Sequence, residues 1–74
     1  MPKKINVSPR EAETIDGLIE KSTKLQAMLL AIQGDGLKPF NNLAESVQDT
    51  YLWACSDLAS ELMELAQRLG ENDV

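Results

Sequence analysis

The stretch GDGLKPFN, residues 34–41, separates two long segments of helical periodicity and therefore decides the fold. Gly34 suits the left-handed conformation that often follows the last turn of a helix. Pro39 favours extended geometry at Lys38, the residue before it. We expect a loop over 34–41, with its large side chains, Leu37 and Phe40, folded back over the ends of the helices.

The segment before this loop begins with a strong helix start. Ser8 can cap the free N–H groups of the first turn, Pro9 suits the first helical position, and Glu11 can complete a capping box. Apolar side chains then recur at helical spacing and predict a helix over about 9–33. Gly17 interrupts this helix, where it either marks a close helix crossing or is simply tolerated.

The segment after the loop predicts a second helix over about 42–69, opened by Asn42 and closed by Gly70. Residues 1–7 are expected to form a tail and 70–74 a frayed end. The chain of 74 residues is thus expected to be one all-α domain, an antiparallel αα-hairpin.

Each predicted helix has an apolar arc of roughly 200°, about twice the width that one helix needs to pack on one neighbour. Two neighbours per helix are therefore expected, and two hairpins paired into a four-helix bundle provide them. A homodimer is the simplest solution, and a groove on a different protein is the main competitor. The candidates for the dimer core are Ile19, Leu25, Leu29, Tyr51, Leu52, Cys55, Leu58, Leu62 and Leu65.

Charge is distributed unevenly along this chain of net charge −5. Residues 41–74 carry Arg68 as their single basic side chain against seven acids, which argues against a phosphate-binding surface there. No apolar run approaches the ~20 residues of a membrane span, and no apolar stretch follows the basic start, as it would in a signal peptide. We expect a cytoplasmic protein of a bacterial or phage-infected cell.

The side chains that could support catalysis do not form a recognisable set. The chain has no histidine, so Cys55 lacks a basic neighbour and is interpreted as a buried structural residue. Asp57, Glu61 and Glu64 are interpreted as a solvated acidic face and not as a cation site, which needs more oxygen ligands. Accordingly, neither enzymatic activity nor a cofactor or metal is expected.

Trp53 lies outside the apolar arc of the second helix, at the level of Ser22 when counted back from the loop. Two interpretations are open: it packs on the tail or across a dimer axis, or it is an exposed anchor for a protein partner. Tryptophan is enriched among the residues that dominate binding energy, and an acidic rim would select a basic partner surface. The candidate partner-binding residues are Trp53, Asp49, Asp57, Ser60 and Glu64.

The basic residues Arg10, Lys21 and Lys24 align on one side of the first helix and form a possible nucleic-acid stripe. Glu13 and Glu20 flank this stripe, and no aromatic side chain interrupts it. A solvated face, with an ordinary i,i+4 pair between Glu20 and Lys24, is the alternative interpretation. Glu64 and Arg68 have the same spacing and are expected to pair as well.

The two-helix plan with an acidic end resembles the Rop family of plasmid copy-number regulators. That resemblance implies a four-helix bundle formed by dimerisation and an RNA-binding role. It concerns architecture, so no RNA-contacting residue is carried over. Tyr51-Leu52-Trp53-Ala54, followed by Asp57-Leu58-Ala59, is also similar to short helical-hairpin proteins of bacteria and implies no activity.

The sequence therefore favours a homodimeric hairpin that binds another macromolecule, and we expect this partner to be a protein. A Rop-like RNA or DNA binder that uses the basic stripe is the first rival. A second rival is a phage or plasmid inhibitor whose acidic face imitates nucleic acid.

Overall fold

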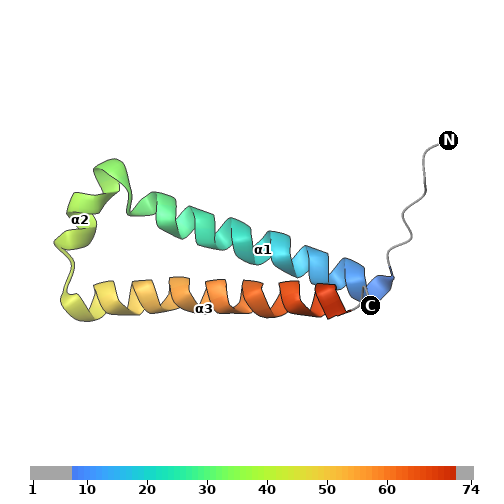
Figure 1. Cartoon of the computed structure of the whole chain (residues 1–74). Helices are drawn as coiled ribbons and strands as arrows, with labels where there is room; N and C mark the ends of the chain where they lie inside the picture. Colours follow the sequence, from blue (N-terminus) through green and yellow to red (C-terminus); the bar gives the residue numbers. More distant parts are fainter. Residues whose placement is uncertain (1–7, 72–74) are drawn as a thin grey trace.

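The computed structural model of the chain describes residues 8–71 as a helical hairpin. Its long helices are α1 (Pro9–Ala31) and α3 (Glu45–Glu71), and a short 3-10 turn (Gly34–Gly36) and helix α2 (Leu37–Asn41) connect them. Helices α1 and α3 run antiparallel beside each other, with α2 at the bend (Figure 1). The predicted all-α antiparallel hairpin is confirmed.

The predicted start of α1 is also confirmed. The Ser8 hydroxyl accepts a hydrogen bond from the Glu11 backbone N–H at 3.1 Å, and the Glu11 carboxylate accepts one from the Ser8 N–H at 3.4 Å. This capping box, with Pro9 at the first helical position, satisfies free donors of the first turn. At its other end α1 stops at Ala31, slightly before the predicted end.

The connection between the long helices differs from the expected loop. Gly34 has the predicted left-handed conformation, with φ of 53°. The expectation of an extended Lys38 is wrong, because Lys38 lies inside α2. Pro39 is tolerated there because it occupies the first turn of the helix, where the backbone nitrogen needs no intrahelical acceptor.

The two apolar side chains of this connection behave differently. Phe40 is only 8% exposed and packs edge-on against Tyr51, with 5.4 Å between ring centroids. It closes the end of the hairpin as expected. Leu37 is 50% exposed, so the same expectation is wrong for that residue.

Helix α3 begins later and ends later than predicted. The Ala44 carbonyl accepts the first helical bond, from the Gln48 N–H at 3.0 Å, so the helix starts at Glu45 and not near residue 42. The Gln48 side-chain amide folds back and donates to the carbonyls of Asn41 at 3.1 Å and Leu43 at 2.8 Å. These bonds satisfy backbone acceptors that a longer helix would otherwise use. At the far end, α3 continues through Gly70 to Glu71.

The contact between the long helices uses a narrow set of positions, which we call the seam. Seam residues recur every three or four positions, the heptad spacing of a coiled coil, and are buried or half-buried. On α1 and its C-cap residue they are Glu11, Thr14, Leu18, Lys21, Leu25, Met28 and Ile32, and on α3 they are Gln48, Tyr51, Cys55, Leu58, Leu62, Leu65 and Leu69. The seam covers only part of each predicted apolar arc.

The helices lie close together near the open end of the hairpin and diverge toward α2 (Figure 1). At the close end, a Cβ atom on Gly17 would lie 3.2 Å from Cδ1 of Leu65, so glycine permits this approach. At the wide end, the rings of Phe40 and Tyr51 fill the space between the two long helices. Of the two interpretations of Gly17, the close helix crossing agrees with this contact.

Candidate functional site

Large apolar side chains remain exposed along both long helices. Seven of them lie on α1 and α3 of the described hairpin: Ile19, Leu29, Leu30, Val47, Leu52, Trp53 and Met63. Leu37 and Leu43, in the connection between these helices, are exposed as well. The predicted dimer-core residues divide accordingly. Six of them belong to the seam within one chain, namely Leu25, Tyr51, Cys55, Leu58, Leu62 and Leu65. The other three, Ile19, Leu29 and Leu52, are exposed and available to a second partner.

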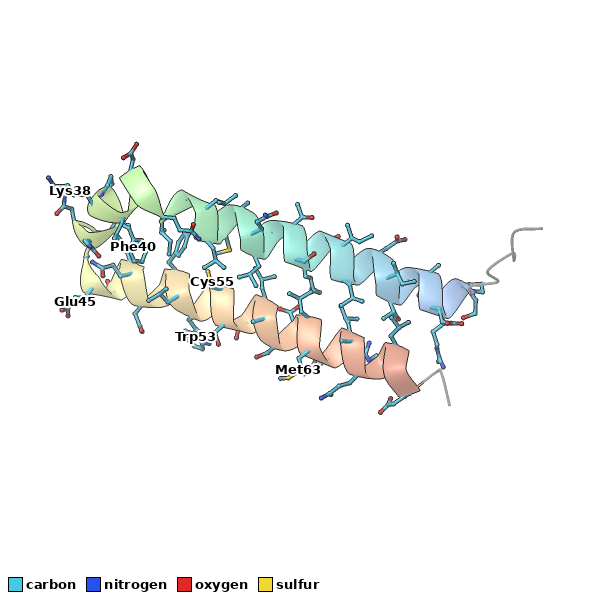
Figure 2. The ribbon with its side chains drawn as sticks, turned by 45° about the horizontal axis from the view of Figure 1, so that its top comes forward. Lys38, Phe40, Glu45, Trp53, Cys55 and Met63 are labelled. Atoms are coloured by element: carbon cyan, nitrogen blue, oxygen red, sulfur yellow. The ribbon has the colours of Figure 1, made fainter. Side chains whose placement is uncertain are left out.

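Trp53 is the most exposed of these side chains, at 67%. It lies on the side of α3 that faces away from α1 (Figure 2). The acidic and polar candidates of the same surface, Asp49, Asp57, Ser60 and Glu64, are exposed as well. The alternative in which Trp53 packs on the tail involves residues 1–7, which lie outside the described residues.

The predicted height of Trp53 along the hairpin is wrong. Gly17 lies beside Leu65, and Lys21 pairs with Glu61, so positions in contact on α1 and α3 have numbers that add up to about 82. By that register Trp53 lies level with Leu29, near the bend, and not with Ser22. The turn and α2 take up the chain between the long helices and set this register.

Lys21 and Glu61 form the most informative polar contact of the hairpin. Nζ of Lys21 lies 2.7 Å from Oε1 of Glu61, although Glu61 was expected on the solvated acidic face. The expectation fails because Glu61 borders the seam and reaches the half-buried Lys21 across it. Lys24 forms the predicted pair with Glu20, at 3.2 Å.

The candidate nucleic-acid stripe is therefore largely neutralised. Two of its three basic residues, Lys21 and Lys24, are paired with carboxylates. Arg10 lies in the first turn of α1, where it lines a hollow with Glu13, Arg68 and Glu71. The expected Glu64–Arg68 ion pair does not form among residues 8–71.

The ion pair of Lys21 predicts a loss of stability at alkaline pH. Its hydrogen bond to Glu61 raises the pKa of Lys21 above the usual 10.5, and partial desolvation only partly opposes this. A raised pKa stabilises the folded state fully below the unfolded value, and the contribution disappears as the pH rises through the folded value. Between about pH 8 and about pH 11, wild type should lose more stability than Lys21→Gln, measured by urea unfolding. Equal losses in both proteins would contradict the prediction.

Two further side chains of α3, those of Tyr51 and Cys55, contribute to the packing of the two helices. The Tyr51 hydroxyl donates a hydrogen bond to the Met28 carbonyl and so links the two helices. Cys55 is 7% exposed and lies in the seam, which confirms the predicted burial.

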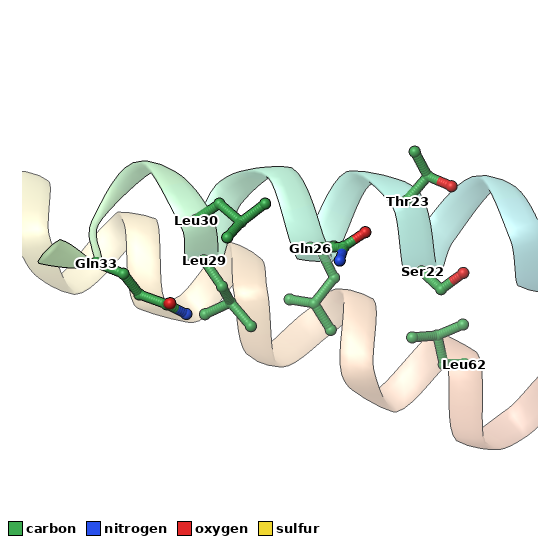
Figure 3. Close-up of a pocket in the computed structure, with 8 residues that line it drawn as sticks. Ser22, Thr23, Gln26, Leu29, Leu30, Gln33 and Leu62 are labelled. Atoms are coloured by element: carbon green, nitrogen blue, oxygen red, sulfur yellow. The ribbon is translucent and has the colours of Figure 1, made fainter. Parts of the chain in front are cut away.

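An open groove of about 480 Å³ runs along α1 beside the seam (Figure 3). Its lining combines leucines with uncharged polar side chains: Ser22, Thr23, Leu25, Gln26, Leu29, Leu30, Gln33 and Leu62. Gln26 and Gln33 were not predicted as site residues, although Gln26 falls on the apolar face predicted for the first helix. A signal was present, since these residues follow a heptad spacing shifted by one position from the seam.

Residues 8–71 contain no cluster of three His, Cys, Asp or Glu side chains arranged to hold a metal ion. None of the helices in this part of the chain combines the length and apolar character that a bilayer crossing requires. No protein-family model, curated protein or solved structure matches this chain.

Proposed function

We propose that the chain is a small, non-enzymatic, protein-binding module that works in the cytoplasm as a homodimer of helical hairpins. The partner of the dimer is a protein with a basic surface, bound through Trp53 and the acidic and polar residues around it. The observation that carries this proposal is the 67% exposure of Trp53 on the outer side of α3.

The chemistry of this surface supports a protein partner. An indole provides a large, rigid apolar area with one N–H donor, and such side chains dominate the energy of many protein interfaces. Asp49 and Asp57 lie one turn before and one turn after Trp53 on the same side of α3, and both are exposed. A carboxylate rim favours approach of a basic surface and excludes an acidic one.

The rival proposal, a Rop-like nucleic-acid binder, has less support. Nucleic-acid affinity depends mainly on Lys and Arg side chains that neutralise phosphates. Lys21 and Lys24 already pair with Glu61 and Glu20. The other rival, an inhibitor whose acidic face imitates nucleic acid, uses the same α3 surface and differs only in the identity of its basic partner.

The test begins with the fluorescence of Trp53, which is the single tryptophan of the chain. The free protein should show red-shifted emission that an aqueous quencher reaches. Trp53→Ala should leave the melting temperature nearly unchanged and weaken binding to a partner identified by pull-down by about 2 kcal/mol or more, roughly 30-fold. Gln67→Ala, an exposed polar residue of α3, is the matched control and should bind like wild type.

Three results would count against this proposal. Blue-shifted, protected emission would place Trp53 in a packed interior. Unfolding of the Trp53→Ala variant would make the residue structural. Tight, strongly salt-dependent binding of RNA, with no loss on Trp53→Ala, would favour the nucleic-acid rival.

A further inference from the structure

Helix α1 carries a second stripe at heptad spacing beside the seam. Its members alternate by three and four positions, as seam residues do, and are Ala12, Ile15, Ile19, Ser22, Gln26, Leu29 and Gln33. Each lies one position after a seam residue, which turns the stripe about 100° round the helix. Within the stripe Ile19 is 59% exposed, so helix α3 of the same chain does not cover it.

Helix α3 repeats this arrangement. The positions that follow its seam residues at the same spacing are Asp49, Leu52, Ser56, Ala59, Met63, Ala66 and Gly70, so this stripe is uncharged from Leu52 onward. The direction is again about 100° from the seam. The groove of Figure 3 lies on this side, because it is lined by stripe residues of α1 together with Leu62 of α3. The two stripes therefore form one face of the hairpin.

This face contains no charged residue from Ile15 to Gln33 on α1 and from Leu52 to Ala66 on α3, and we call it the uncharged face. The opposite face holds the Lys21–Glu61 pair and Arg10, Glu13, Glu20, Lys24 and Arg68. In a chain with 26% charged residues, the central part of this side thus carries none, and Asp49 lies at its end near the bend. Depletion of charge is typical of the buried centre of a protein interface.

The exposed apolar side chains of this face also point to a missing partner. Ile19, Leu29, Leu52 and Met63 all belong to its two stripes, and they are between 37% and 60% exposed. Soluble monomers rarely leave large apolar patches in water. A partner that covers these side chains would bury them at the apolar centre of an interface.

We infer that a second copy of this chain covers the uncharged face, and that the stripe on α1 is the second seam of a four-helix bundle. The inference rests on the homodimer of the proposed function and assigns its interface. A face without charge gives a heterologous partner no electrostatic basis for selection, whereas it is compatible with itself in a two-fold assembly. Ser22, Gln26, Gln33 and Ser56 supply uncharged donors and acceptors that can pair across the interface and fix its register. Trp53 stays outside it, free for another protein.

Charge insertion tests the assignment. Ile19→Glu and Met63→Glu each place one carboxylate on the uncharged face, from α1 and from α3 respectively. Ala27→Glu is the matched control, since Ala27 is exposed on the other side of α1. In sedimentation equilibrium, both face variants should raise the dimer dissociation constant at least about 100-fold, and the control should change it less than about threefold.

The outcomes separate this inference from the proposed function. A wild-type dimer that survives both face variants overturns the assigned interface and leaves a homodimer standing. A wild type that is monomeric at all concentrations overturns the homodimer and this inference together. Loss of partner binding by Trp53→Ala with an intact dimer concerns the Trp53 surface alone.

Thiol protection keeps the test decisive if a glutamate variant fails to fold. In a Cys55→Ala background, Gln26→Cys places a small thiol in the centre of the uncharged face, and Ala27→Cys places one outside it. Labelling of the thiol at position 26 should slow by about tenfold as protein concentration rises through the dissociation constant, and labelling at position 27 should not change. Concentration-independent labelling at position 26 overturns the inference.

Discussion

Leu58→Asp is expected to unfold the hairpin. Leu58 belongs to the seam and is half-buried between α3 and α1. A carboxylate there loses hydration without gaining a counter-ion, and the lost leucine packing adds to the cost. The combined cost, about 3–5 kcal/mol, is comparable to the whole stability of a domain this small. Circular dichroism should show loss of most helical signal, without a cooperative melting transition.

Ser60→Asp is the control for this prediction. Ser60 lies two positions further along α3 and is exposed, so its carboxylate remains hydrated. The control should keep the helical content of wild type, and its melting temperature should change only slightly, since surface substitutions usually alter stability by less than about 0.5 kcal/mol. A folded Leu58→Asp protein with the stability of wild type would show that the seam does not hold the hairpin together.

The melting temperature of the wild-type protein should rise with its concentration. If the folded state is a dimer, each tenfold increase in concentration stabilises it by about 1.4 kcal/mol. For a domain of this size, that change corresponds to several degrees. Thermal melts followed by circular dichroism across a hundred-fold range of concentration, roughly two such steps, measure the effect directly.

Sedimentation equilibrium at micromolar concentration should give the mass of a dimer. A melting temperature that does not depend on concentration, together with a monomer mass, would contradict this prediction. In that case the isolated hairpin is stable with its apolar face in water, which the stripes of α1 and α3 argue against.

The sequence by itself determined the elements of this fold whose signals are local. The capping box of Ser8 and Glu11 and the left-handed Gly34 depend on neighbours within a few residues and were predicted correctly. The outward position of Trp53 also follows from helical spacing alone, because a residue so far from the apolar arc cannot reach α1. The burial of Cys55 follows from the same spacing.

Only the tertiary structure decided which part of each apolar arc packs within the chain. An arc of roughly 200° fits two neighbours, and nothing in its composition tells which half meets the other helix of the same chain. That choice depends on the register between α1 and α3, which α2 and its turn determine. The same register brings Lys21 to Glu61, forty positions away, and leaves Ile19, Leu29 and Leu52 exposed. Periodicity within one helix fixes directions around its axis, whereas contacts between helices also require their relative height and rotation, which only the packed structure provides.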